Sequence, residues 1–250
     1  MSQPAASPLL PTIAFIGGGN MASAIIGGLI HQGHPASQIE VVEPWAEARE
    51  ALRKNYGIEA QAEAGPALQR AQIVVWAVKP QTFRDAAAQA KAHTQGALHL
   101  SVAAGIRSDS IAQWLGTERI VRTMPNTPAL VGKGMSALYA RPAVSAPERQ
   151  SIEAIMATTG EFLWVDSEPQ LDAVTALSGS GPAYVFYFLE AMTRAGTGMG
   201  LTEQQAHQLA VGTFVGASEL ARRSDDPPSV LRQRVTSKGG TTYAALQSME

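Results

Sequence analysis

A glycine-rich run near the amino end has the residue types and spacing to hold a diphosphate. The run is Gly17-Gly18-Gly19-Asn20-Met21-Ala22, and it follows the apolar stretch Ile13 to Ile16. We expect Gly17 to make a turn too tight for a Cβ atom, Gly19 to let a phosphate approach the main chain, and Ala22 to let a helix pack close to its strand. The free amides and the positive dipole at the start of that helix favour a pyrophosphate.

An acid stands at the position expected for a dinucleotide site. Glu43 ends the apolar stretch 39–42 and lies about 20 residues beyond Ala22, where such folds place the acid that binds the adenosine ribose. The alternative is a glycine-rich turn that binds nothing. The strand and helix patterns on either side favour the nucleotide site.

A second cluster near the carboxyl end is suited to a carboxylate. The run Ser237-Lys238-Gly239-Gly240-Thr241-Thr242 precedes a short helical pattern. Its amides and hydroxyls could converge on one concave spot. Simple N-capping of the helix by Thr241 or Thr242 is the alternative.

Three further motifs follow expected strands and fall on the same edge of a parallel sheet, where ligands bind. They are Ala77-Val78-Lys79-Pro80, Ala103-Ala104-Gly105 and Met124-Pro125-Asn126-Thr127-Pro128. The small residues at 103–105 would let a flat ring lie against the backbone. Asn126 could line a nicotinamide pocket or belong to a rigid structural turn, and Lys79 could bind the cofactor or be a solvated charge.

The composition argues against several classes of protein. The 250 residues include no cysteine, and their formal net charge is −2, so there is neither a thiol nucleophile nor a basic stripe for nucleic acid. The five histidines lack ligand spacing; we expect them at the surface or at helix ends and predict no metal site. The first residues do not read as a signal peptide, and no apolar run is long enough for a membrane span, so we expect a cytoplasmic protein that binds a small molecule.

The pattern of elements predicts an α/β fold, a Rossmann-like doubly wound sheet followed by an all-helical C-terminal domain. About eight strands are expected, among them a weak one at Ile58-Glu59-Ala60, and strand signals cease near residues 165–168. We therefore place a dinucleotide-binding domain at residues 1–166 and a helical dimerisation and substrate domain at 167–250.

Two helices of the second half are unusually apolar. The segments 183–199 and 203–223 carry more apolar surface than a unit of this size needs for its own core. Burial against another subunit is the favoured interpretation, and core packing is the alternative. The segment Ser178-Gly179-Ser180-Gly181-Pro182 does not fit a nucleophile elbow, because it follows a helix rather than a strand.

These motifs together resemble the pyrroline-5-carboxylate reductase family over nearly the whole chain from Ile13. The carboxyl-terminal signature is matched at Pro228, Leu231, Val235-Thr236-Ser237, Gly239-Gly240, Thr242, Ala245-Leu246 and Met249-Glu250. The motifs at 77–80, 124–128 and 178–182 are similar to internal motifs of that family.

The resemblance implies the last step of proline biosynthesis, hydride transfer from NADPH or NADH to the C=N bond of 1-pyrroline-5-carboxylate, giving L-proline. It implies that Thr242 hydrogen-bonds the imine nitrogen and that Ser237, Gly239, Gly240 and Thr241 surround the substrate carboxylate. Glu168 is a further substrate-site residue on the resemblance alone. A homodimer or a higher assembly of dimers is expected. Glu43 favours a free ribose diol, with Arg49 the nearby cation, so the choice between the two cofactors stays open.

Two rival functions remain. One is a dehydrogenase of the 3-hydroxy-acid or 6-phosphogluconate type, which commonly uses a lysine on a helix of its second domain. The only lysine after residue 133 is Lys238, in the terminal loop. The other is a non-catalytic nucleotide-binding relative, which would bind the cofactor without oxidising it.

Overall fold

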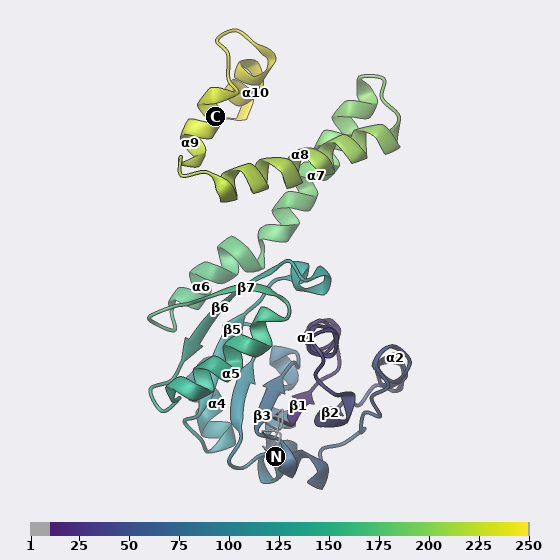
Figure 1. Ribbon diagram of the computed structural model, residues 1–250, viewed down its shortest axis with the longest axis vertical. Coiled ribbons are helices and arrows are strands. Elements are labelled where there is room, and N and C mark those ends of the chain that lie inside the picture. The colour runs from purple at the N-terminus through teal and green to yellow at the C-terminus, as the bar shows by residue number, and fades with distance from the viewer. Residues whose placement is uncertain (1–10, 250) are drawn as a thin grey trace, which may run out of the picture. The chain divides into compact units, whose positions relative to one another are not determined.

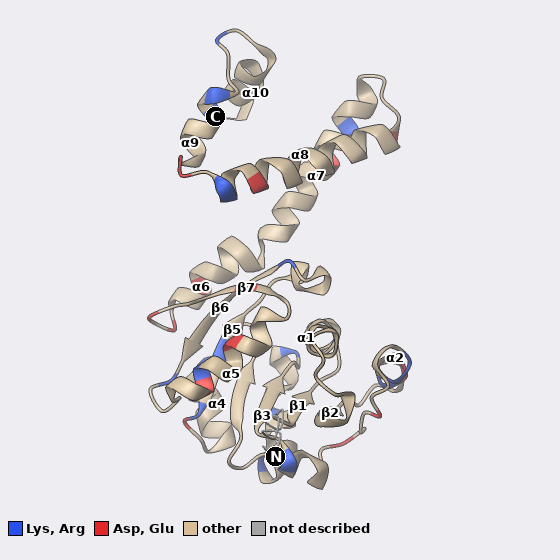
Figure 2. Ribbon diagram, in the orientation of Figure 1, with Lys and Arg blue, Asp and Glu red and all other residues tan. Residues whose placement is uncertain are grey.

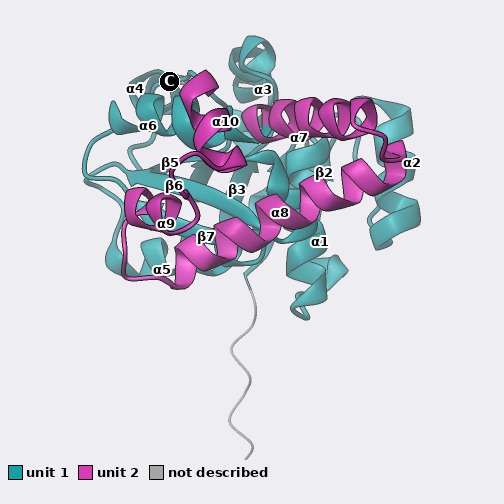
Figure 3. Cartoon of the chain, turned by 90° about the horizontal axis from the view of Figure 1, so that it is seen from above, with its two compact units in different colours: residues 1–182 teal, residues 183–250 magenta. Residues whose placement is uncertain are grey.

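A computed structural model describes residues 11–249 of the chain. It divides into two compact units, residues 1–182 (unit 1) and 183–250 (unit 2), which Figure 3 colours teal and magenta. Glu250, the last residue of the carboxyl-terminal signature, lies outside the described residues, as do the first ten residues of the expected nucleotide domain. The expected division after residue 166 stays a prediction.

Unit 1 is built on a seven-stranded sheet in the order β2-β1-β3-β4-β5-β6-β7 (Figure 1). Neighbouring strands run parallel except β5 and β6, which are antiparallel. The strands are β1 Ile13–Ile16, β2 Ile39–Val42, β3 Ile73–Trp76, β4 Leu98–Ser101, β5 Ile120–Met124, β6 Gly134–Ala140 and β7 Gly160–Trp164. The Rossmann-like doubly wound sheet and the helical C-terminal region are confirmed.

The expectation of about eight strands was wrong. The weak segment Ile58-Glu59-Ala60 forms no strand; next to it, Gln61 makes only an isolated bridge to Val42. Ile58 is buried in the core, so its apolar side chain reflects packing rather than strand pairing. A segment this short gains too little from one bridge to extend the sheet.

Helices cover both faces of the sheet. On one face, apolar side chains of α1 Asn20–His31, α2 Ala46–Tyr56 and α5 Ala146–Ala157 pack in one core cluster. On the other face, α3 Phe83–Ala90 and α4 Ser108–Leu115 pack in a second cluster. β1, β3 and β4 are therefore buried on both sides, which explains the continuous apolar sequences of β1 and β3.

One histidine does not lie where it was expected. His99 is in the middle of β4, and His34 follows α1; both are buried. The polar ring of His99 is tolerated inside the sheet because the indole Nε1 of Trp76 donates a hydrogen bond of 3.0 Å to its Nδ1. The expectation that all five histidines are surface or helix-end residues was wrong for this one.

The last part of unit 1 is helical. The short helix α6 Gln170–Val174 continues as a π-helical turn, Thr175–Gly179, and leads into α7 Gly181–Gly198. π-helical turns are rare and frequently occur at functional sites.

Unit 2 contains most of α7, together with α8 Glu203–Arg223, α9 Pro228–Arg234 and α10 Thr241–Met249. A capping box of Thr202 and Gln205 fixes the start of α8. Of its described residues 183–249, the buried ones are Gly196, Ala206 and Ala210, all small. None of the described helices is long and apolar enough to span a bilayer, and the same residues hold no cluster suited to a metal ion.

Candidate active site

The glycine turn after β1 lies against the end of β3. Gly17 has a φ of 97°, and its N–H donates to the carbonyl oxygen of Val42 at 2.8 Å. A Cβ atom added to Gly17 would lie 2.5 Å from the carbonyl oxygen of Ala77. Only glycine fits there, because the backbone angle and the contact both exclude a side chain.

The next two glycines have different surroundings. A Cβ on Gly18 would lie 3.3 Å from the side chain of Glu43, whereas a Cβ on Gly19 would have nothing within 4 Å. Gly18 thus packs against the acid at the end of β2, while Gly19 borders open space. This arrangement leaves room for a ligand directly in front of helix α1.

The start of α1 is suited to an anion. Its N-cap is Gly19, whose lack of a side chain leaves the first amides without a side-chain cap, and the first turn carries no acid. By contrast, α2, α3, α4 and α5 each carry an acid in the first turn. Uncapped amides and an unopposed helix dipole attract a diphosphate. The residues present therefore fit a dinucleotide cofactor.

Glu43 connects the glycine turn with the start of α2. It is buried, 6% exposed, with Oε2 accepting from the Gly18 N–H at 2.7 Å and Oε1 from the Trp45 N–H at 2.9 Å. Arg49 Nη1 donates to the carbonyl oxygens of Glu43 and Pro44, at 2.9 and 2.6 Å. The carboxylate shapes the turn and remains next to the ribose position that the fold implies.

The other sequence candidates of unit 1 follow the same edge of the sheet. The register pairs Ile16 with Trp76 and Trp76 with Ser101, so the loops that begin at Gly17, Ala77 and Val102 stand in a row. Lys79 and Pro80 are exposed, Val78 is partly buried, and of the two alanines Ala103 is buried and Ala104 exposed. The structure brings the predicted cofactor residues together at this edge.

Asn126 is held by hydrogen bonds on both sides of its amide. Its Nδ2 donates to the hydroxyl and the carbonyl oxygen of Ser178, at 3.2 and 3.3 Å, and its Oδ1 accepts from the Met135 N–H at 2.9 Å. A Cβ on Gly179 would lie 2.5 Å from the Met124 Cε. The end of β5 and the loop after it are therefore packed against the π-helical turn and hydrogen-bonded to it.

Glu168 belongs to a buried ion pair in unit 1. Its Oε1 accepts from Arg122 Nη1 at 2.6 Å and from the Ser108 N–H at 2.6 Å, and its Oε2 accepts from the Ser108 hydroxyl at 2.7 Å. Burial by itself would raise the pKa of Glu168, but the hydrogen bonds from Ser108 and Arg122, with the charge of Arg122, together lower it below its ordinary value. Glu168 is ionised and joins the start of α4 to β5.

The carboxyl-terminal cluster lies in unit 2. The Gly240 N–H donates to the Ser237 carbonyl oxygen at 3.0 Å, and Gly239 has a φ of 75°, as the third residue of a type II turn requires. The amide of Gly240 is thus engaged inside the turn. Thr241 and Thr242 form the first turn of α10, and within the described residues neither hydroxyl has a partner.

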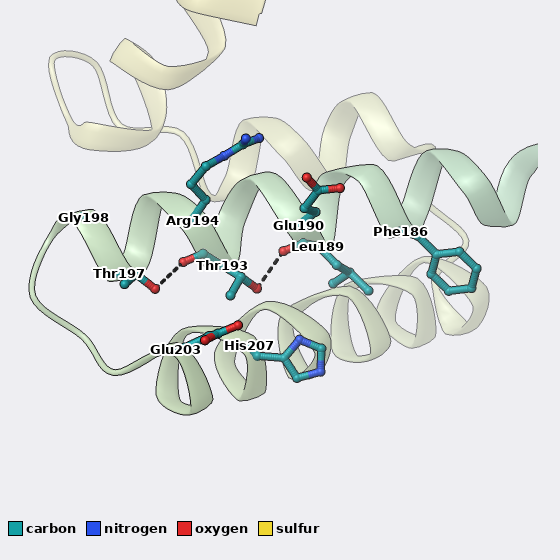
Figure 4. A pocket seen from close by; sticks show the side chains of 9 residues that line it. All are labelled: Phe186, Leu189, Glu190, Thr193, Arg194, Thr197, Gly198, Glu203 and His207. Carbon is teal, nitrogen blue, oxygen red and sulfur yellow. Dashed lines mark hydrogen bonds between the residues drawn. The ribbon is translucent and has the colours of Figure 1, made fainter.

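A separate groove of about 640 Å³ lies between α7 and α8 of unit 2 (Figure 4). Thr193 and Thr197 line it, and their hydroxyls donate to the carbonyl oxygens of Leu189 and Thr193, at 2.8 and 2.9 Å. These two hydroxyls are bound within their own helix, and the titratable side chains of the lining are Glu190, Arg194, Glu203 and His207. None of the predicted site residues lines this groove.

Known families and proteins resemble this chain over nearly its whole length. The model of pyrroline-5-carboxylate reductase dimerisation matches residues 168–250, and a model described as NADP oxidoreductase coenzyme F420-dependent matches residues 12–105. A pyrroline-5-carboxylate reductase of Pseudomonas aeruginosa is 46% identical over 242 residues, which cover 96% of this chain and 89% of the relative. The chain belongs to the pyrroline-5-carboxylate reductase family.

Solved structures agree with this family. A pyrroline-5-carboxylate reductase from Coxiella burnetii has a TM-score of 0.87 at 36% identity, covering 96% of this chain and 90% of that one. The enzyme of Plasmodium falciparum, solved with NADP bound, has a TM-score of 0.86 at 28% identity, with 96% and 89% covered. Both matches cover residues of unit 1 and of unit 2, so the motifs of the two units occur together in the solved members of the family.

Two residues of this arrangement, Arg122 and Ser178, were not predicted from the sequence. Arg122 was given no role, although a charge within a buried strand pattern signals a paired partner. Ser180 rather than Ser178 was considered in the segment 178–182, and nothing in that segment shows that Ser178 faces an asparagine 52 residues earlier.

Proposed function

We propose that this chain reduces the C=N bond of 1-pyrroline-5-carboxylate with NADH or NADPH and releases L-proline. It is an NAD(P)H-dependent oxidoreductase of proline biosynthesis that acts on a cyclic imine. The observation that carries the proposal is the 46% identity to a pyrroline-5-carboxylate reductase over nearly the whole chain. The glycine turn, with its uncapped helix start, supports the binding of a dinucleotide.

The protein's task in this reaction is mainly to bind and to orient. The nicotinamide, when bound, supplies the hydride. A protonated imine carbon is already electrophilic, so holding it against the hydride donor lowers the barrier most. We assign the diphosphate to Gly18, Gly19, Asn20 and Met21, and the nicotinamide edge to the loops at 77–80, 103–104 and 126.

We assign the substrate to the start of α10. The hydroxyl of Thr242 donates a hydrogen bond to the imine nitrogen and relays its proton. The carboxylate lies at the first amides of α10 with Ser237 and Thr241, in a turn that Gly239 and Gly240 shape. Glu168 stays a weaker candidate, because both of its oxygens are bound to Ser108 and Arg122.

Replacing Thr242 by alanine tests the assignment. We expect kcat/KM for 1-pyrroline-5-carboxylate to fall about 100-fold, because a positioned proton donor contributes on this scale. Thr242→Ser, which keeps the hydroxyl, should restore most of the activity. The matched control is Ser151→Ala in α5 of unit 1, whose hydroxyl donates to Pro147 of its own helix. Unchanged turnover in Thr242→Ala would exclude the proposed role.

Parallel assays separate the rival functions. Oxidation of NADH or NADPH that depends on 1-pyrroline-5-carboxylate supports the reductase. Reduction of NAD+ or NADP+ that depends on the oxidation of a 3-hydroxy acid would support the dehydrogenase instead. Cofactor binding without turnover of either substrate would point to a binding protein.

We further propose that unit 2 pairs with a second copy of the chain, as a homodimer or an assembly of dimers. The apolar side chains that α7 leaves exposed and the small number of buried residues in unit 2 support this. α7 carries only Glu190 and Arg194 as charged residues (Figure 2). The family model that matches residues 168–250 also carries dimerisation in its description. A cytoplasmic location stays a prediction.

A further inference from the structure

The turn after β2 has a composition that bears on which cofactor enters. It reads Glu43-Pro44-Trp45-Ala46-Glu47, with two acids and no cation before Arg49. This is the part of a dinucleotide-binding sheet that meets the adenosine ribose, where NADH presents a free diol and NADPH a phosphate. The turn therefore contains the groups that distinguish the two.

Glu43 is poorly placed for a neighbouring phosphate. Its carboxylate is buried and fixed by the N–H groups of Gly18 and Trp45, so it cannot swing away without breaking both bonds. A carboxylate accepts about four hydrogen bonds, so about two sites remain for ribose hydroxyls. A phosphate monoester carries about −1.5 to −2 charges at neutral pH and is repelled by a fixed anion next to it.

The neighbouring cations are already bound to the protein. Arg49 Nη1 spans the carbonyl oxygens of Glu43 and Pro44, which holds the guanidinium against the turn backbone. Arg53, one helical turn further on, pairs with Glu50 at 2.6 Å. A 2′-phosphate, which favours a bidentate guanidinium, would meet an Arg49 whose Nη1 is already bound to the backbone and an Arg53 that must first leave Glu50.

Trp45 is the second group in this turn, and it is unlike the other tryptophans. Trp76 stacks on Phe83, Trp114 lies against Phe83, and Trp164 donates to Glu153. Trp45 is 76% exposed and has no ring partner within the described part of the chain. Its backbone N–H is nevertheless held by Glu43, so the exposed indole is anchored beside the ribose position. An anchored, exposed indole is a stacking surface for a planar base.

We propose that Glu43 and Trp45 form an adenosine subsite that selects NADH over NADPH. Glu43 accepts hydrogen bonds from the ribose diol and excludes the 2′-phosphate, and the indole of Trp45 stacks on the adenine. This inference rests on the proposed function for the presence of a nicotinamide cofactor. It adds the preference between the two forms and the residue that contacts the base.

The experiment measures dissociation constants from the fluorescence of the dihydronicotinamide. Three ligands are titrated: NADH, NADPH and reduced nicotinamide mononucleotide, which lacks the adenosine. The unchanged protein should bind NADH at least about tenfold more tightly than NADPH. In competition with NADH, 5′-AMP should bind more tightly than adenosine 2′,5′-bisphosphate. Equal or tighter binding of NADPH would overturn the selection.

Variants separate the two residues. Glu43→Gln should reduce the preference for NADH to about twofold or less, because the fixed negative charge is gone. Trp45→Ala should weaken NADH about fivefold or more, and Trp45→Phe less, because stacking on the base is lost or reduced. Neither Trp45 variant should change the affinity for the mononucleotide. If Trp45→Ala weakens both ligands equally, or neither, the stacking role is wrong.

Turnover measurements distinguish a failure of the NADH selection from a failure of the proposed reductase function. If the protein reduces 1-pyrroline-5-carboxylate with a lower KM for NADPH, the function stands and the selection fails. If it binds NADH selectively but does not reduce the imine with either cofactor, the selection stands and the reductase assignment fails.

Discussion

His99 is a titratable group kept neutral by its position inside β4. It is 2% exposed, and its Nδ1 accepts the indole hydrogen bond from Trp76. Burial lowers the pKa of His99 to about 4, and the charge of Arg119 adds to the effect. Protonation of Nδ1 would also remove the acceptor that Trp76 requires.

We expect this histidine to make the stability of unit 1 depend on pH. Between pH 6.5 and about 4 the unfolded chain binds more protons than the folded chain, so the free energy of unfolding decreases as the pH falls. The contribution is complete above pH 6.5, and its loss at low pH is on the order of 3 kcal/mol. Urea unfolding at pH 7 and pH 5 measures it.

His99→Asn is the informative variant, since an asparagine Oδ1 can accept from Trp76 without becoming charged. Its unfolding free energy should change less between pH 7 and pH 5 than that of the unchanged protein. The control His31→Asn alters an exposed histidine at the end of α1 and should keep the original pH dependence. An equal pH dependence in all three proteins would contradict the prediction.

At the scale of elements, local sequence patterns located most of the structure. The helix expected at 203–223 is α8 residue for residue, and the apolar run 13–16 is β1. These segments have a strong period and clear end signals, such as the capping box at Thr202. The π-helical turn 175–179 was not expected, and its contact with Asn126, 52 residues before Ser178, is not visible in the local sequence.

The hydrogen bonds between Asn126 and Ser178 of the π-helical turn give a prediction at this scale. Asn126→Asp keeps the oxygen that accepts from Met135 but replaces the donor to Ser178 by an acceptor. We expect it to lower the free energy of unfolding by about 1–3 kcal/mol, because a partly buried carbonyl loses its donor. Thermal unfolding measures this against Asn55→Asp, an exposed site in α2. A loss of cofactor affinity with unchanged stability would instead assign Asn126 to the nicotinamide pocket.

At the scale of the whole molecule, the apolar surface of unit 2 predicts self-association. Leu209 of α8 is 59% exposed in the single chain. Several aromatic residues of α7 are also exposed. A large apolar surface on a folded protein marks an interface. The isolated chain has a mass of 26.3 kDa, so light scattering after gel filtration distinguishes a monomer from a dimer or a larger assembly.

Leu209→Glu tests the surface directly. We expect it to weaken association about 100-fold or more, because a charge is desolvated within an apolar interface. Leu130→Glu makes the same change at an exposed leucine of unit 1 and should leave the mass unchanged. A monomeric mass for the unchanged protein, or an unaffected assembly in Leu209→Glu, would contradict the proposal.

The order of residues alone determined most of the strands and helices, the glycine turn and the family, because apolar period, turn residues and motif spacing are properties of neighbouring positions. The tertiary structure decided what the polar groups do. It placed the Glu43 carboxylate on the Gly18 and Trp45 amides, the His99 ring on the Trp76 indole, and the Asn126 amide on Ser178. A buried polar group must find its partner wherever folding brings one within about 3 Å, and no local pattern encodes that distance.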